Sequence, residues 1–372
     1  MKFSRRLPAE LRPNILATTL DEMRRAGVRI LDLTESNPTR AGIEYPSGLV
    51  EALADVRALR YEPEPFGLAL AREAIAHEFG APFDRVALAA STSELYSWLF
   101  KLLCDPGDEV LTPRPSYPLF EHLAALESVA IRSYALFYDY GWFIDFQTLR
   151  DAMTERTRAV VVVSPNNPTG NFVRRREWEE LTAICAERGV AVIADEVFQD
   201  YALEESSQRL DALACPVFRL NGLSKTVGLP QMKLAWMIAE GPENEVAPAL
   251  ARLEIIADTY LSAGTPVQCA AESLLKVREP VQRQILARLR ENLALVNGSG
   301  LRVLRVDAGW YAITTLPPRL PEEETTERLL RERKVLVQPG YFYDFERSGY
   351  LVLSLLTPPD VFREGVHAIL SL

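Results

Sequence analysis

Residues 217–233 read VFRLNGLSKTVGLPQMK and place Lys225 shortly after a short apolar run, Val217 to Leu220. The run is typical of a buried strand, and the residues around Lys225 are small or apolar. A lysine in such surroundings is poorly hydrated, which favours its neutral, nucleophilic form. Such an amine can form a Schiff base with an aldehyde. Taken alone, the pattern is more typical of a solvated lysine at a strand end, so the hypothesis depends on other residues.

Two upstream stretches have the same layout, because each is an apolar run followed by polar residues. Residues 159–163 (AVVVV) lead into a loop that contains Asn167, and residues 190–194 (VAVIA) lead into Asp195. The C-terminal ends of parallel strands meet in one crevice, so we expect both side chains near Lys225. An amide, a carboxylate and a lysine suit pyridoxal phosphate. The amide would contact its phenolic oxygen, the carboxylate its pyridine nitrogen, and the lysine would bind its aldehyde.

Together these motifs resemble the class I and II aminotransferases, which are fold-type I pyridoxal-phosphate enzymes. The resemblance runs from about residue 31 to about residue 356 and keeps the family's order of motifs: Asn167-Pro168-Thr169-Gly170, Asp195-Glu196 and Ser224-Lys225. It implies a transaminase that exchanges an amino group between an amino acid, or an amine, and a keto acid by a ping-pong mechanism. It also implies a homodimer.

The alternation of strands and helices, together with the resemblance, predicts an α/β fold. We expect a large cofactor-binding domain with a mostly parallel sheet flanked by helices over residues 41–264. A smaller α+β domain should combine residues 1–40 with residues 265–372. The patterns predict helices over 15–25, 95–103, 174–188, 244–261, 272–297 and 322–333.

The resemblance also assigns roles to individual residues. It places around the cofactor Ser91, Thr92, Tyr117, Asn167, Asp195, Ser224 and Lys233, with Tyr61 reaching the phosphate of the neighbouring subunit. For the substrate it indicates the turn that holds Ser36, Asn37 and Arg40, and Arg347 is a further candidate because it is the arginine nearest to Val352. Ser91 also has capping-box spacing to Glu94, so the helix that follows would offer free N–H groups and a positive dipole end to a phosphate. Ser91 can cap that helix without excluding phosphate binding.

Five positions depart from the family's pattern. Glycine is usual at Ser36 and Ser91, arginine at Lys233 and tyrosine at Phe198, and an arginine for the substrate carboxylate is usual at Val352. Lysine keeps a positive charge for the phosphate but lacks the bidentate fork of arginine. Valine cannot bind a carboxylate at all. Two alternatives follow: Arg40 or Arg347 holds the carboxylate, or the substrate has no α-carboxylate.

Composition narrows the remaining classes of function. The 372-residue chain has a net charge of −10, which disfavours nucleic acid and anionic membranes as partners. Its four cysteines and three histidines are scattered, so we expect no metal site. Without a secretory signal or a spanning apolar run, a cytoplasmic protein is expected. A lyase on the same fold, and a non-catalytic protein with a degenerate pocket, are the alternatives to a transaminase.

Overall fold

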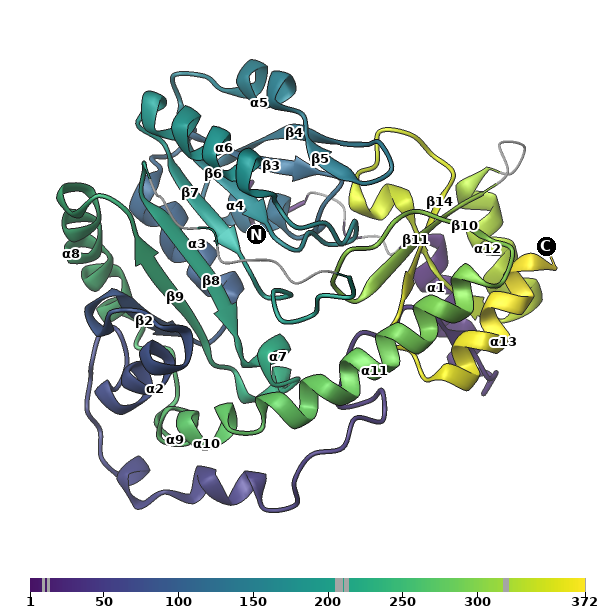
Figure 1. Ribbon diagram of the computed structural model, residues 1–372, viewed down its shortest axis with the longest axis horizontal. Helices are drawn as coiled ribbons and strands as arrows, with labels where there is room; N and C mark the ends of the chain where they lie inside the picture. Colours follow the sequence, from purple (N-terminus) through teal and green to yellow (C-terminus); the bar gives the residue numbers. More distant parts are fainter. Residues whose placement is uncertain (9–10, 12–13, 205–209, 211–213, 317–320, 372) are drawn as a thin grey trace.

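The computed structural model describes residues 1–8, 11, 14–204, 210, 214–316 and 321–371, and its centre is an eight-stranded sheet (Figure 1). The strands lie in the order β2-β9-β8-β7-β6-β3-β4-β5. Their bounds are β2 Val86–Ala89, β3 Glu109–Arg114, β4 Ala130–Tyr138, β5 Trp142–Ile144, β6 Thr157–Val163, β7 Ala191–Asp195, β8 Val217–Gly222 and β9 Ala235–Glu240.

Five neighbouring strands of this sheet, from β8 to β4, are parallel, and β5 and β9 pair with them antiparallel. The three strands that carry the sequence motifs, β6, β7 and β8, lie side by side. Val163 at the end of β6 pairs with Asp195, which in turn pairs with Leu220 of β8. The expected mostly parallel sheet is therefore confirmed, and the ends of the three motif strands lie at one edge.

Both faces of the large sheet are covered, as the alternation along β6 shows. Val160 and Val162 belong to a hydrophobic cluster that includes Trp178 of α6 (Arg175–Arg188). Val161 and Val163 belong to a second cluster, with Trp98 of α3 (Thr92–Leu103). Successive side chains of a strand point to opposite faces. Helices α6 and α3 thus pack on opposite sides of β6, as in a three-layer α/β arrangement.

A second, smaller sheet lies beside the large one, at the far end of the long helix α11 (Arg278–Asn297) (Figure 1). It is antiparallel, in the order β10-β11-β14-β13, with bounds β10 Arg302–Val303, β11 Tyr311–Thr315, β13 Gln338–Pro339 and β14 Tyr350–Ser354. The N-terminal region joins this part of the molecule, because β1 (Leu31–Asp32) pairs in parallel with β12 (Val335–Leu336). The small domain is α+β, as expected.

Most expected helices appear within three residues of their predicted bounds: α1 Ile15–Arg25, α3, α6, α8 Glu243–Tyr260 and α12 Glu322–Arg333. The structure has further helices, among them α2 Ala69–Phe79, α4 Phe120–Leu126, α5 Phe146–Ala152, α7 Leu223–Thr226, α9 Thr265–Cys269 and α13 Pro359–Leu370. None of the described helices is long and apolar enough to cross a membrane.

The prediction of one helix over residues 272–297 is wrong in one respect, because the structure has two helices there. Helix α10 (Ala271–Leu275) ends before α11 begins at Arg278. Pro280 lies in the first turn of α11. A proline has no N–H to donate to the carbonyl four residues earlier, that of Lys276, and its ring would clash with that carbonyl in a continuous helix. The break follows from this residue.

Candidate active site

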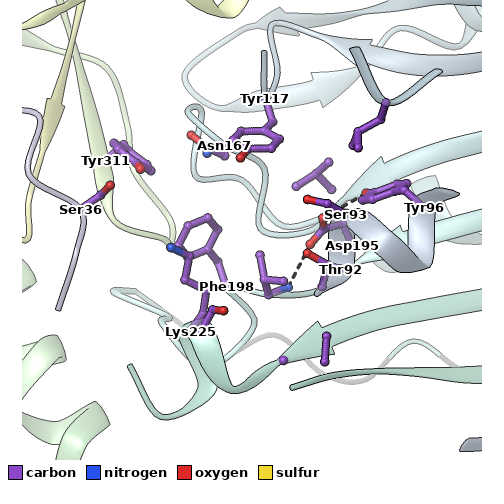
Figure 2. A pocket seen from close by; sticks show the side chains of 16 residues that line it. Ser36, Thr92, Ser93, Tyr96, Tyr117, Asn167, Asp195, Phe198, Lys225 and Tyr311 are labelled. Carbon is purple, nitrogen blue, oxygen red and sulfur yellow. Dashed lines mark hydrogen bonds between the residues drawn. The ribbon is translucent and has the colours of Figure 1, made fainter. Parts of the chain in front are cut away.

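The C-terminal ends of β6, β7 and β8 open into a cavity of about 190 Å³ (Figure 2). Helix α3 closes one side of it, and β11 of the small sheet and the loop after β1 close the other. The polar side chains that line it are Ser36, Thr92, Ser93, Tyr96, Tyr117, Asn167, Asp195, Ser224, Lys225 and Tyr311. The cavity thus brings together the three motifs that lie far apart in the sequence.

Lys225 lies in the short helix α7, directly after β8. Its Nζ is 4.6 Å from the ring centre of Trp310 and 5.5 Å from that of Phe198, and the Tyr201 hydroxyl donates to its backbone carbonyl at 2.5 Å. Burial lowers the pKa of the amine to about 8, although the Asp195 carboxylate opposes this change. At pH 7 roughly one tenth of the amine is then neutral, far more than for an exposed lysine.

Asp195 ends β7, where its carboxylate is held from two sides. The backbone N–H of Val197 donates to Oδ1 at 3.2 Å, and the Tyr96 hydroxyl donates to Oδ2 at 3.0 Å. Burial raises the pKa of Asp195 to about 6, and both hydrogen bonds act against this rise. At neutral pH the group is therefore mostly an anion, fixed in orientation and ready to pair with a protonated nitrogen.

Asn167 lies in the loop after β6 and contributes an amide to the cavity. Its side-chain Oδ1 is buried and has no hydrogen-bond partner in the described structure. A buried polar atom without a partner costs free energy, so an unpaired amide facing a cavity indicates a ligand that completes its hydrogen bonds. The amide, the anion and the amine match the three polar positions of pyridoxal phosphate, and the site fits that group.

The end of the cavity beside α3 suits an anion. The Ser91 hydroxyl caps the helix by accepting from the Glu94 N–H at 3.2 Å. The cap uses the N–H of Glu94. The N–H groups of Thr92 and Ser93 come before it in the helix and have no carbonyl partner within the helix, so they can bind a phosphate. Ser224 lines the cavity as well. Ser91 does not, so its contribution is to hold the helix terminus.

Lys233 does not reach the cavity. It is exposed, in a left-handed backbone conformation after a 3-10 helix that spans Pro230–Met232, and it is not among the lining residues. Tyr61 is 79% exposed and lies on a separate surface. This position is compatible with a residue that acts in a neighbouring subunit. The phosphate role of each residue stays a prediction.

Of the four substrate residues expected from the sequence, Ser36 lines the cavity. The Asn37 side chain accepts instead from the backbone and hydroxyl of Thr39. Arg40 is exposed and lies 3.3 Å from Glu35 in an ion pair. Arg347 is exposed too, and neither arginine lines the cavity. The structure thus brings Ser36 to the site and leaves the other three outside its wall.

Comparison with known proteins gives the same assignment as the geometry. Residues 30–369 match the family model described as aminotransferase class I and II. The chain belongs to this family. It is 28% identical to the glutamate–pyruvate aminotransferase of Haemophilus influenzae over 91% of this chain and 89% of that protein.

Two solved structures share the fold of this aminotransferase. An aminotransferase from Escherichia coli superposes with a TM-score of 0.88 at 21% identity, covering 99% of this chain and 97% of the other. A double mutant of the aspartate aminotransferase of Thermus thermophilus gives 0.85 at 25% identity, with 99% and 98% covered. The mixed α/β architecture is therefore that of fold-type I aminotransferases. Among the described residues, no cluster of histidine, cysteine and carboxylate side chains could hold a metal ion.

Sequence reasoning missed three lining residues of this aminotransferase. Ser93 is part of the same Ser-Thr-Ser run as Thr92, and Tyr96 lies one turn further along α3, so helical periodicity could have found both. Tyr311 reaches the cavity from β11, more than 80 positions after Lys225. No local pattern marks Tyr311, because its position depends on the packing of the small sheet.

The lowered pKa of Lys225 predicts how the cofactor-free enzyme captures an aldehyde. The rate of covalent capture of pyridoxal phosphate should rise with pH and level off above about 8, because the neutral amine is the nucleophile. Stopped-flow absorbance across pH 6 to 10 measures the midpoint. In Asp195→Asn the midpoint should move lower, because the carboxylate raises the pKa of Lys225. A midpoint near that of an exposed lysine would contradict the burial argument.

The Tyr96 hydroxyl predicts a shift in the titration of Asp195. In Tyr96→Phe, the Asp195 carboxylate loses a donor that stabilises its charged form. The pKa of Asp195 should therefore rise above about 6, and its affinity for the proton should increase roughly tenfold. Carbon-13 NMR of labelled aspartate in the cofactor-free protein measures this value. Tyr134→Phe is the matched control, because that buried hydroxyl donates to the Val161 carbonyl. An unchanged titration in Tyr96→Phe would refute the prediction.

Proposed function

We propose that this aminotransferase binds pyridoxal 5′-phosphate in the cavity and transfers an amino group between an amino acid or amine and a keto acid or other ketone. One observation supports this function above the others. The amine of Lys225, the anion of Asp195 and the unpaired amide of Asn167 meet at the ends of three adjacent parallel strands. A protein without chemistry has little use for a buried lysine of lowered pKa.

The bound group supplies an aldehyde carbon that forms bonds to amines and a ring that accepts the electron pair released at the substrate carbon. Lys225 holds that group at rest. With a substrate amine bound, the Nζ of Lys225 would act as the general base that takes the proton from the substrate carbon, and then as the general acid that returns it to the former aldehyde carbon. Asp195 keeps the ring nitrogen protonated, and Asn167 orients the ring.

The phosphate would be held by neutral donors in the described part of this chain. Thr92, Ser93 and Ser224 supply hydroxyls, and the N-terminus of α3 adds free N–H groups and the positive end of its dipole. The Tyr117 ring, at the mouth of the cavity, would stack on the flat cofactor.

We also propose a homodimer. A segment of the large domain exposes several apolar side chains: Val50, Val56, Leu59 and Tyr61 are each more than 60% accessible to solvent. Neighbouring exposed apolar residues of this kind mark an interaction surface. Tyr61 in this surface would then reach the cavity of the other subunit. Sedimentation velocity should give twice the monomer mass, and a monomer at micromolar concentration would refute the dimer.

The reaction class can be tested by product counting. The protein is loaded with pyridoxal phosphate and mixed with a panel of amino acids and amines, first without and then with a keto acid acceptor. A transaminase forms one carbonyl product per subunit without acceptor, releases no ammonia, and turns over repeatedly once the acceptor is added. Continuous release of ammonia and keto acid without acceptor would identify a lyase instead. Protein reduced with borohydride before mixing is the control and should form no product.

A further inference from the structure

The wall of the cavity opposite Asp195 is built from uncharged hydroxyl groups. Ser36 and Tyr311 lie next to each other on that side, away from Asp195 and Tyr96, with Tyr117 above them (Figure 2). Burial raises the pKa of Tyr311, and the neighbouring Ser36 hydroxyl opposes this. At neutral pH these three groups are therefore hydrogen-bond donors and acceptors without charge.

A further phenol, that of Tyr343, lies near Tyr311 and Tyr117. The Tyr343 hydroxyl donates to the side-chain oxygen of Gln338, which is the register partner of Val352. Burial, and then the nearby phenols of Tyr311 and Tyr117, raise the pKa of Tyr343 well above its usual value. The three phenols are thus close enough to influence one another. At the position of Val352, which is fully buried, the protein places an amide and phenols rather than a cation.

Among the described residues, the charges that line the cavity are those of Lys225 and Asp195. Of the sixteen residues that line it, Asp195 and Lys225 are the ones whose side chains ionise near neutral pH. Lys225 is needed for the aldehyde, and Asp195 is an anion. Unlike a phosphate at the N-terminus of α3, a carboxylate at this wall gains neither an opposite charge nor the positive end of a helix dipole, so the loss of its hydration is costly. A hydroxyl or an amide exchanges hydrogen bonds with water for bonds of the same kind.

We propose that this wall selects an amino substrate whose second polar group is uncharged, an amino alcohol or an amino amide, over the α-amino acid of the same carbon skeleton. The inference rests on the proposed transaminase function and deepens it. In the first half-reaction the substrate carbon loses its amino group and a hydrogen and takes a carbonyl oxygen from water. The nitrogen, the proton and the electron pair would pass to the aldehyde carbon of pyridoxal phosphate, whose oxygen would leave as water, so that one water is consumed and one released. The acceptor enters the same cavity, so the same preference applies to carbonyl substrates.

Matched compounds test the preference. The protein loaded with pyridoxal phosphate is mixed with alanine, alaninamide and alaninol in one series, and with phenylalanine and phenylalaninol in a second series. Loss of the cofactor's visible absorbance gives a rate and a half-saturating concentration for each compound. The alcohol and the amide should half-saturate the enzyme at a roughly tenfold lower concentration than the acid. A tenfold difference in affinity corresponds to the free energy of about one hydrogen bond. An acid that reacts as well as its alcohol or better in either series would overturn the proposal.

Variants of the wall locate the effect. Tyr311→Phe and Ser36→Ala should each raise the half-saturating concentration several-fold more for alaninol than for isopropylamine, which has no second polar group. Tyr140→Phe, an exposed tyrosine outside the cavity, is the matched control. An equal loss for both amines would indicate a merely structural role and overturn the assignment. A weaker reaction with alanine in Arg40→Ala or Arg347→Ala would also overturn the proposal, because that arginine would then hold the carboxylate of the substrate.

The proposed function and this inference fail in different ways. If the acids react better, the enzyme is a transaminase and the inference alone is wrong. If no compound changes the absorbance although borohydride fixes the cofactor to Lys225, the transaminase function is wrong and the inference falls with it.

Discussion

Lys225→Ala should abolish turnover and remove the covalent attachment of the cofactor. No other lysine lines the cavity in the described part of the chain, and the aldehyde would have no amine to bind within reach. The variant also loses the group that moves the proton at the substrate carbon. Borohydride reduction followed by peptide mapping measures the attachment, and a coupled assay measures the turnover.

Lys276→Ala is the matched control for Lys225→Ala. Lys276 lies on the surface, paired with Glu272 four residues earlier in the chain, and its replacement should leave both the attachment and the turnover unchanged. A Lys225→Ala protein that still turns over substrate at the normal rate would refute the entire assignment of the site.

Asp195→Asn should keep the cofactor bound and slow the reaction by about a thousandfold, ~4 kcal/mol of barrier. The amide has nearly the same shape, but it carries no charge to hold a proton on the ring nitrogen. Without that proton the ring is a poor electron sink, and removal of the substrate proton becomes slow. Single-turnover kinetics with substrate deuterated at the reacting carbon should show a larger isotope effect in the variant than in the unaltered enzyme.

Asp139→Asn, at an exposed position, is the control for Asp195→Asn and should react normally. The cofactor content of each protein, measured after release in alkali, separates slow chemistry from lost binding. An Asp195→Asn protein within about threefold of the normal rate, ~0.65 kcal/mol of barrier, would show that the carboxylate is not the group that sustains the electron sink.

The residues that the sequence could predict share one property. Asn167, Asp195 and Lys225 each follow an apolar run of strand length, and strands of a parallel sheet end at a common edge. The rule is local, so no knowledge of distant contacts was needed. The capped start of α3 is equally local, since the Ser91 hydroxyl and the Glu94 N–H are three residues apart.

What the sequence leaves open depends on contacts between distant parts of the chain. The sequence predicts Arg40 and Lys233 at the site because of their place in a motif, whereas in the structure both side chains are exposed and outside the lining, so their roles stay predictions. Backbone direction decides this: Lys233 has a left-handed conformation that follows a tight 3-10 turn. Tyr96 was missed because its role depends on where β7 ends relative to α3.

The sequence by itself determined the aminotransferase family and the α/β fold, and it predicted the residues for pyridoxal phosphate, because strand patterns, caps and short motifs depend on neighbours in the chain. Tertiary structure alone decided the chemistry of the opposite wall. Ser36 and Tyr311 meet because the N-terminal segment pairs with the small domain through β1 and β12, and β11 pairs with β14. The first pairing joins residues 304 positions apart, and the second joins residues 35 to 43 positions apart. Burial and approach of side chains, which set their charge and their selectivity, follow only from that packing.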